Sequence, residues 1–135
     1  MGEDKKKVFH IGSLALERIK NSKLDSKSNF EKKIKFKLGR KSILFTYHPT
    51  RKKIDKEKKD IKTIFNALKK IKDCNFIFTL PNSDPLSDQI TNEIYKFKKQ
   101  NKKKCVIFKS MSQNLFYSAM KNCSLIVGNS SSAII

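Results

Sequence analysis

Cysteine and long apolar runs are both scarce in this sequence of 135 residues. The three cysteines, Cys74, Cys105 and Cys123, are an odd number without paired spacing, which argues against a disulfide framework and against a zinc site. No apolar run reaches transmembrane length, and no apolar signal-peptide core follows the lysines near the start. We therefore expect a cytoplasmic protein with buried, reduced thiols and with neither a metal nor a cofactor.

Arginine and acidic side chains are also few. The net charge is +19, yet only Arg18, Arg40 and Arg51 carry the planar guanidinium that suits bidentate recognition of bases and phosphates. The remaining positive charge is lysine, scattered through every polar segment. We expect a solvated lysine-rich surface with weak, salt-sensitive binding to polyanions, and no specific nucleic-acid site. A basic α/β module that binds RNA or DNA stays the alternative.

The apolar residues that are present alternate between two patterns. Short continuous runs of strand length occur at residues 43–47, 76–80, 105–108 and 125–127. Apolar residues at helical spacing lie between these runs: Ile61, Ile64, Phe65, Leu68 and Ile71; Ile90, Ile94 and Phe97; Leu115, Phe116, Ala119 and Met120. Strands that alternate with helices predict a Rossmann-like α/β domain with a parallel sheet and flanking helices.

The first 41 residues lack this alternation. Residues 8–13 are consistent with a strand or an extended segment, and residues 14–20 with a brief helix. Ser28 and Glu31 have the spacing of a capping box at the start of a second short helix. We therefore expect residues 1–41 to be a lead-in segment outside the core, and residues 42–135 to form the domain.

Residues 125–135 read as a strand, a phosphate-binding turn and the first turn of a helix. Gly128 and Asn129 end the apolar run, and Ser130, Ser131 and Ser132 follow before the chain turns apolar again. Such a turn directs unpaired backbone N–H groups and the positive end of a helix dipole at one anionic group. Asn and Ser are also ordinary helix caps, so the turn alone leaves phosphate binding and simple capping as alternatives.

Ligands of parallel sheets bind beyond the carboxyl ends of the strands. That rule predicts one crevice shared by His48, Asn82, the loop 110–113 and the turn 129–132. Four strands are few for a doubly wound sheet, and the sequence ends inside the helix that should follow the fourth. We therefore expect a partial domain.

Three motifs occur in a fixed order: Thr46-Tyr47-His48-Pro49, Pro81-Asn82-Ser83-Asp84 and Gly128-Asn129-Ser130-Ser131-Ser132. Together they resemble the C-terminal half of the hydrolysing UDP-N-acetylglucosamine 2-epimerases, which serve synthesis of sialic-acid and legionaminic-acid type sugars. The opening residues 2–13 look like the crossover from the N-terminal domain of that family. The resemblance thus covers nearly the whole chain and implies an incomplete C-terminal half of a GT-B fold.

Carried over by position, the resemblance implies that Ser130 and Ser131 hold the diphosphate of a UDP-sugar, with Asn129 and Ser132 in the same turn. Phe116 matches the aromatic side chain that stacks on uracil, although its spacing alone equally suits a core residue. His48 matches the family's active-site histidine, but it could also cap a turn. Asn82 matches a contact to the sugar, but it could also form a turn. Arg51 is only loosely assigned as a partner of phosphate. His10 matches no family site, so we expect a structural role for it.

The family's reaction begins with loss of the C2 proton and elimination of UDP, and water then adds to the glycal to release the 2-epimeric sugar. The resemblance places the acids for proton transfer in the N-terminal domain and a further acid just after Ile135. We therefore expect a UDP-binding half with little turnover alone, from a protein whose complete relatives are homo-oligomers. A nucleotide-binding domain without catalytic function is a second alternative.

Overall fold

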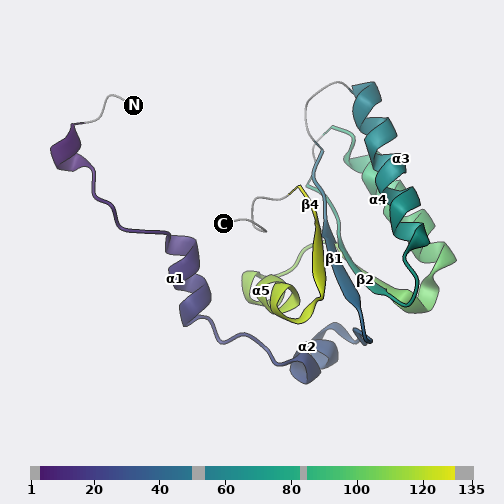
Figure 1. Ribbon diagram of the computed structural model, residues 1–135, viewed down its shortest axis with the longest axis horizontal. Helices are drawn as coiled ribbons and strands as arrows, with labels where there is room; N and C mark the ends of the chain where they lie inside the picture. The colour runs from purple at the N-terminus through teal and green to yellow at the C-terminus, as the bar shows by residue number, and fades with distance from the viewer. Residues whose placement is uncertain (1–3, 50–53, 83–84, 130–135) are drawn as a thin grey trace.

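The computed structural model describes residues 4–49, 54–82 and 85–129. Its centre is a sheet of four parallel strands in the order β3-β2-β1-β4, as Figure 1 shows. The strands are β1 (Ser42–Thr46), β2 (Asn75–Thr79), β3 (Cys105–Phe108) and β4 (Leu125–Gly128). The parallel Rossmann-like sheet predicted from the sequence is confirmed.

The register brings the carboxyl ends of the strands to one level. Thr46 at the end of β1 pairs with Thr79 on one side and with Gly128 on the other, and Thr79 pairs with Phe108. The loops that follow the strands therefore leave the sheet along a single edge. We call this row of strand ends the carboxyl edge.

Helices cover both faces of the sheet. Helices α3 (Ile54–Lys70) and α4 (Ser87–Gln100) lie on one face, and α2 (Lys27–Ile34) and α5 (Gln113–Asn122) lie on the other (Figure 1). The remaining elements are α1 (Leu14–Asn21) and two short 3-10 helices, η1 (Lys5–Lys7) and η2 (Lys102–Lys104). No helix among the described residues is long and apolar enough to span a bilayer.

Alternating side chains of the strands build a separate core on each face. Ile43 and Phe45 of β1 join the cluster under α3 and α4, whereas Leu44 joins the cluster under α2 and α5. All five residues of β1 are buried, as expected for a central strand covered on both faces. The first cluster is rich in aromatic rings, and the centroids of Phe76 and Phe97 lie 5.0 Å apart in an edge-to-face arrangement.

The core extends into the segment that we expected to be a lead-in. Phe30 and Leu38 are almost completely buried against Leu44 and the α5 side of the sheet. The predicted capping box is also wrong, because Ser26 rather than Ser28 caps α2, by accepting from the N–H of Asn29. Ile34 is buried in the same cluster, so α2 and its exit turn place three apolar side chains in the core.

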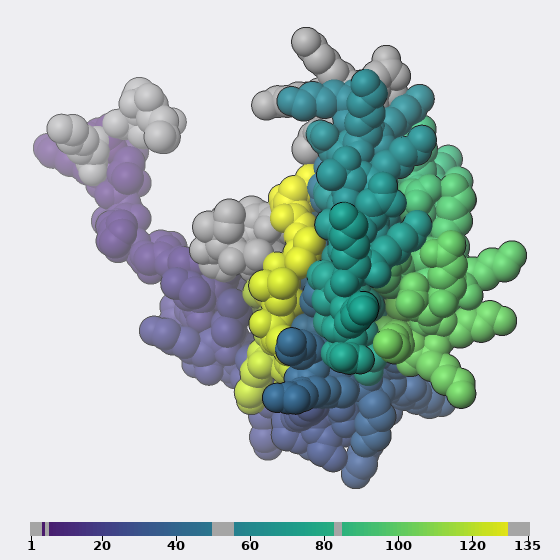
Figure 2. Space-filling model, turned by 45° about the vertical axis from the view of Figure 1, so that its right-hand side comes forward, coloured from purple at the N-terminus to yellow at the C-terminus, as the bar shows by residue number. Residues whose placement is uncertain are grey.

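The residues before α2 form an arm that leaves the body of the molecule. Residues 8–13 have no strand, which leaves the extended interpretation, while the predicted helix over 14–20 is confirmed as α1. The arm exposes large apolar side chains. Figure 1 shows it on the side of α5, and Figure 2 shows it projecting from the rest of the molecule. The largest exposed fractions are those of Phe9 and Ile11, at 77% and 70%.

Two further expectations differ from the structure at helix ends. Ile71 lies just beyond the end of α3 and is exposed, so the inner stripe of that helix ends at Leu68. In the sequence, Asp84 followed by Pro85 resembles an N-cap and the first residue of a helix. Helix α4 instead begins at Ser87, after Leu86, whose positive φ of 72° makes the turn. The inner face of α4 is nevertheless the predicted set, since Ile90, Ile94 and Phe97 are all buried.

Replacing Gly128 by alanine should weaken the pairing of β4 with β1. A Cβ atom on Gly128 would overlap with the backbone carbonyl of Thr46, and backbone cannot move aside as a flexible side chain does. We expect a loss of about 2 kcal/mol in the free energy of unfolding, measured by urea denaturation. Leu125→Ala, at a half-exposed position of the same strand, should change it by less than about 1 kcal/mol, and equal losses would contradict the close approach.

The raised pKa values of the buried thiols predict a decrease in stability at alkaline pH. Burial raises the pKa of Cys105 from 9.0 to about 11, and burial also raises the pKa of Cys74. The unfolded chain therefore releases these protons first, and stability should fall as the pH rises from about 9 towards 11. Urea midpoints at pH 8 and pH 10 test this, and Cys105→Val should flatten the decline. An unchanged decline in that variant would exclude Cys105 as a cause.

Candidate functional site

The strand order creates a switch point between β1 and β4. From β1 the chain moves outward to β2 and β3, and it then returns to place β4 on the opposite side of β1. Doubly wound sheets form their ligand crevice at such a point, beyond the carboxyl ends of the two strands. His48 follows β1 and Asn129 follows β4, so the two lie at this point of the carboxyl edge.

Asn129 and His48 are joined by a pair of hydrogen bonds. The backbone N–H of His48 donates to Oδ1 of Asn129 over 2.8 Å, and Nδ2 of Asn129 donates to the backbone carbonyl of His48 over 2.6 Å. Both ends of the amide are therefore used, and a shorter side chain could not bridge the two loops. The side chain of Asn129 thus holds the loop of His48, and the contact of Asn129 with a UDP-sugar that the family resemblance implies stays a prediction.

The imidazole of His48 carries a buried nitrogen. Its Nδ1 is shielded from solvent and has no hydrogen-bond partner among the described residues. A buried imidazole nitrogen gains from a partner, because leaving such a group unpaired costs about 1–3 kcal/mol. An arriving polar ligand or the neighbouring turn can supply that partner.

A cavity of about 490 Å³ opens along the carboxyl edge beside His48. Residues from the ends of three strands and from the start of α5 line it: Thr46, His48, Thr79, Leu80, Asn82, Lys109, Ser110, Met111, Gln113, Phe116 and Tyr117. Its size is within the usual range for small-molecule sites. The convergence of loops that the sequence predicts is therefore present for the ends of β1, β2 and β3.

The charge of this cavity is positive. Lys109 is the one side chain with a permanent charge among the described residues of the lining, and that lining contains no Asp or Glu. A neutral or anionic ligand can therefore enter without meeting a carboxylate, whereas proton abstraction by a carboxylate has no candidate there. The described lining is suited to binding and stabilising an anion.

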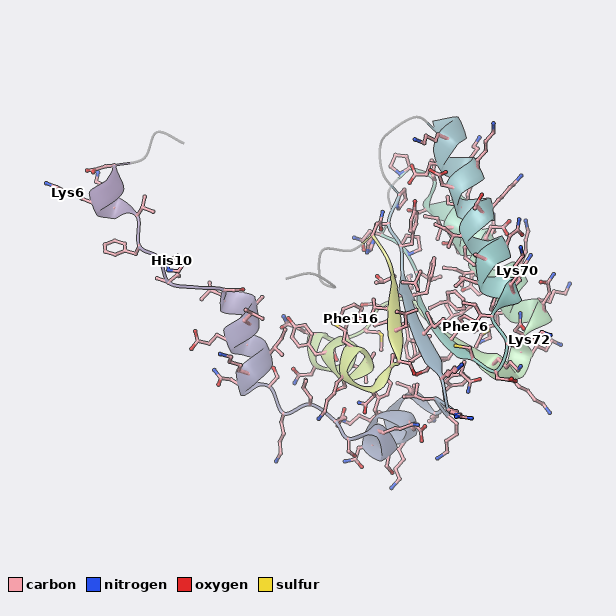
Figure 3. The ribbon with its side chains drawn as sticks, in the orientation of Figure 1. Lys6, His10, Lys70, Lys72, Phe76 and Phe116 are labelled. Carbon is pink, nitrogen blue, oxygen red and sulfur yellow. The ribbon has the colours of Figure 1, made fainter. Side chains whose placement is uncertain are left out.

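Most of the predicted site residues that the structure describes line the cavity. His48, Asn82 and Phe116 line the cavity, and the carbonyl of Asn82 accepts from the hydroxyl of Ser87, which fixes its backbone. Phe116 (Figure 3) also packs against the core cluster under α5, which confirms its interpretation as a core residue, while stacking on uracil stays a prediction. His10 lies exposed on the arm and outside the cavity (Figure 3).

Four predicted residues lie outside the described part of the chain: Arg51, Ser130, Ser131 and Ser132. The expected phosphate-binding turn therefore stays a prediction, tied to the described site through Asn129.

Sequence reasoning missed five lining residues: Thr46, Thr79, Leu80, Lys109 and Tyr117. Thr46 and Thr79 end their strands, and Lys109 directly follows β3, so a search of every strand end would have found them. Tyr117 has no such signal, since it follows Phe116 on α5 in an otherwise ordinary helix pattern.

Comparison with known proteins gives a consistent result. The sequence model of the family described as UDP-N-acetylglucosamine 2-epimerase matches residues 1–135. The chain is 35% identical over 134 residues to the GDP/UDP-N,N'-diacetylbacillosamine 2-epimerase (hydrolyzing) of Campylobacter jejuni, and 27% identical over 135 residues to the UDP-N,N'-diacetylbacillosamine 2-epimerase (hydrolyzing) of Legionella pneumophila. These alignments cover 99% and 100% of the chain but only 35% of each relative.

One solved structure is also similar, the C-terminal domain of a group 1 family glycosyl transferase from Francisella tularensis. The TM-score is 0.47 with 15% identity, over 76% of this chain and 52% of that one. The family match, in contrast, extends over the full length of the sequence. The chain belongs to the UDP-N-acetylglucosamine 2-epimerase family.

Proposed function

We propose that this chain is the nucleotide-binding, C-terminal half of a hydrolysing 2-epimerase that acts on UDP-N-acetylglucosamine or UDP-N,N'-diacetylbacillosamine. The observation that carries the proposal is the cavity at the carboxyl edge, where His48, Asn82 and Phe116 meet without a carboxylate beside them. We further propose that the complete protein acts in the cytoplasm as a homo-oligomer.

In this proposal UDP lies along the carboxyl edge. Phe116, from the start of α5, stacks on uracil, and the turn 130–132 after β4 holds the diphosphate. The edge from β3 to β4 spans three strand spacings, roughly 14 Å, which is comparable to an extended nucleoside diphosphate. His48 at the end of β1 lies along that path, where Nδ1 can meet a phosphate or sugar oxygen.

The chemistry divides between this chain and the rest of the protein. Elimination removes the proton at C2 of the sugar, forms the C1–C2 double bond of a glycal and breaks the bond from C1 to the diphosphate. Water then adds a hydroxyl at C1 and a proton at C2, which yields the free 2-epimer. This half stabilises UDP as a leaving group, since donors on the diphosphate oxygens lower that barrier.

A carboxylate that could take the C2 proton has no candidate among the described lining residues of this cavity. The chain spans about a third of the length of its curated relatives, so the remaining two thirds have room for the catalytic acids. On its own this chain should bind UDP and give little or no turnover.

Calorimetric titration with UDP tests the site through Ser131→Asp. The wild-type chain should release heat at physiological ionic strength, and the added carboxylate should weaken binding at least about tenfold by repelling the diphosphate. Ser28→Asp places the same charge on an exposed position of α2 and should leave binding unchanged. The absence of heat from folded wild-type protein would contradict the proposal. If both variants changed the affinity for UDP equally, UDP would bind elsewhere.

The two histidines offer an internal comparison by nuclear magnetic resonance. UDP should shift the imidazole signals of His48 and leave those of His10, which is exposed on the arm, unchanged. Asn129→Ala removes two hydrogen bonds to the His48 loop and should reduce UDP affinity about tenfold. Asn92→Ala, at an exposed position on α4, is the matched control. A response of His10 with none at His48 would contradict the assignment.

A further inference from the structure

Lys109, Gln113 and Tyr117 are three of the hydrogen-bonding side chains that line the cavity together with Phe116. Lys109 directly follows β3, and Gln113 and Tyr117 lie one turn apart on α5. All three line the cavity beside Phe116. We refer to Lys109, Gln113 and Tyr117 as the polar triplet.

A hydrogen bond within the polar triplet orients two of its members. Nε2 of Gln113 donates to the hydroxyl oxygen of Tyr117 over 2.9 Å. The amide nitrogen is thereby directed at Tyr117, and Oε1 of Gln113 is left as an acceptor. The Tyr117 oxygen accepts in this bond, so its own proton can be donated to another group. The Lys109 ammonium is a donor only.

We propose that the polar triplet reads the base of the nucleotide and selects uracil. This inference rests on the proposed function, and it names the groups that decide which nucleoside diphosphate the site accepts. The triplet offers an acceptor, Oε1 of Gln113, together with donors from Lys109 and Tyr117. Uracil presents the complementary edge, in which the N3–H donor lies between the O2 and O4 acceptors.

Other bases present a mismatched edge. Cytosine replaces N3–H by an acceptor and O4 by an amino group, so an acceptor meets an acceptor and a donor meets a donor. Guanine keeps an acceptor and an N–H but has an amino group in place of the second carbonyl, which opposes a donor of the triplet. Discrimination by such unpaired groups is strong in fully buried sites, and Gln113 and Lys109 are exposed, so a moderate selectivity is expected.

Phe116 and the polar triplet contribute differently to nucleotide binding. Every base has an aromatic face, so stacking on Phe116 contributes affinity without distinguishing bases. The triplet contributes the preference. A variant of Phe116 should therefore weaken all nucleotides together, while a variant of the triplet should change their ratio.

The experiment measures the affinities of the 135-residue chain for UDP, CDP and GDP at one ionic strength. Wild-type protein should bind UDP at least about tenfold more tightly than CDP, which corresponds to roughly one unpaired hydrogen-bonding group. Gln113→Met and Tyr117→Phe should each bring the ratio of the two affinities towards one. Phe116→Leu should weaken all three nucleotides and preserve the ratio.

Lys109→Met provides a test of the donor with a matched control. It should reduce the preference for UDP over CDP, whereas Lys121→Met, which removes the same charge at the far end of α5, should leave the preference unchanged. Equal effects of the two lysine variants would show that only net charge matters and would overturn the role of Lys109.

Two outcomes separate this inference from the proposed function. If folded wild-type protein binds none of the three nucleotides, both fail. If it binds UDP and CDP equally, or if the ratio survives in Gln113→Met and Tyr117→Phe, the nucleotide site stands and base reading by the triplet is wrong. Far-UV circular dichroism of each variant shows whether the fold is retained. If Gln113→Met unfolds, Tyr117→Phe still tests the inference, because it removes a single hydroxyl.

Discussion

The pairing of β4 with β1 is the constraint on which the rest of the structure depends. It reverses the strand order at the centre of the sheet and so creates the crevice at the carboxyl edge. Gly128 permits the close approach to Thr46, and Asn129 in the next position is hydrogen-bonded to the backbone of His48. Gly128 and Asn129 therefore allow β4 to pair with β1 and hold the backbone of His48 in place.

The cavity is organised as a binding site rather than a complete reaction centre. Its described lining combines a lysine, a histidine with a buried nitrogen, amides and hydroxyl groups, with no acid among them. Such a set stabilises a leaving group and orients a nucleotide, but it offers no carboxylate to take a proton from carbon. This division agrees with a chain that covers 35% of the length of its relatives.

Periodicity was sufficient to predict the sheet and three of its helices, because buried strands and amphipathic helices have distinct spacings. It failed where tertiary packing decides the outcome: Phe30 and Leu38 join the core from a segment with no strand of its own, and Ser26 caps α2 in place of Ser28. At the site, strand-end residues such as His48 and Asn82 could be predicted from topology. The bond between Gln113 and Tyr117, and the use of Asn129 as a bridge between loops, depend on side-chain geometry that no spacing reveals.

The central claim is that a uridine nucleotide lies along the carboxyl edge with its base on Phe116. Intermolecular nuclear Overhauser effects between bound UDP and isotopically labelled protein test it most directly. The account predicts contacts from uracil H5 and H6 to the ring protons of Phe116. Contacts from uracil to Ile61 in the groove between α3 and α4, with none to Phe116, would contradict it.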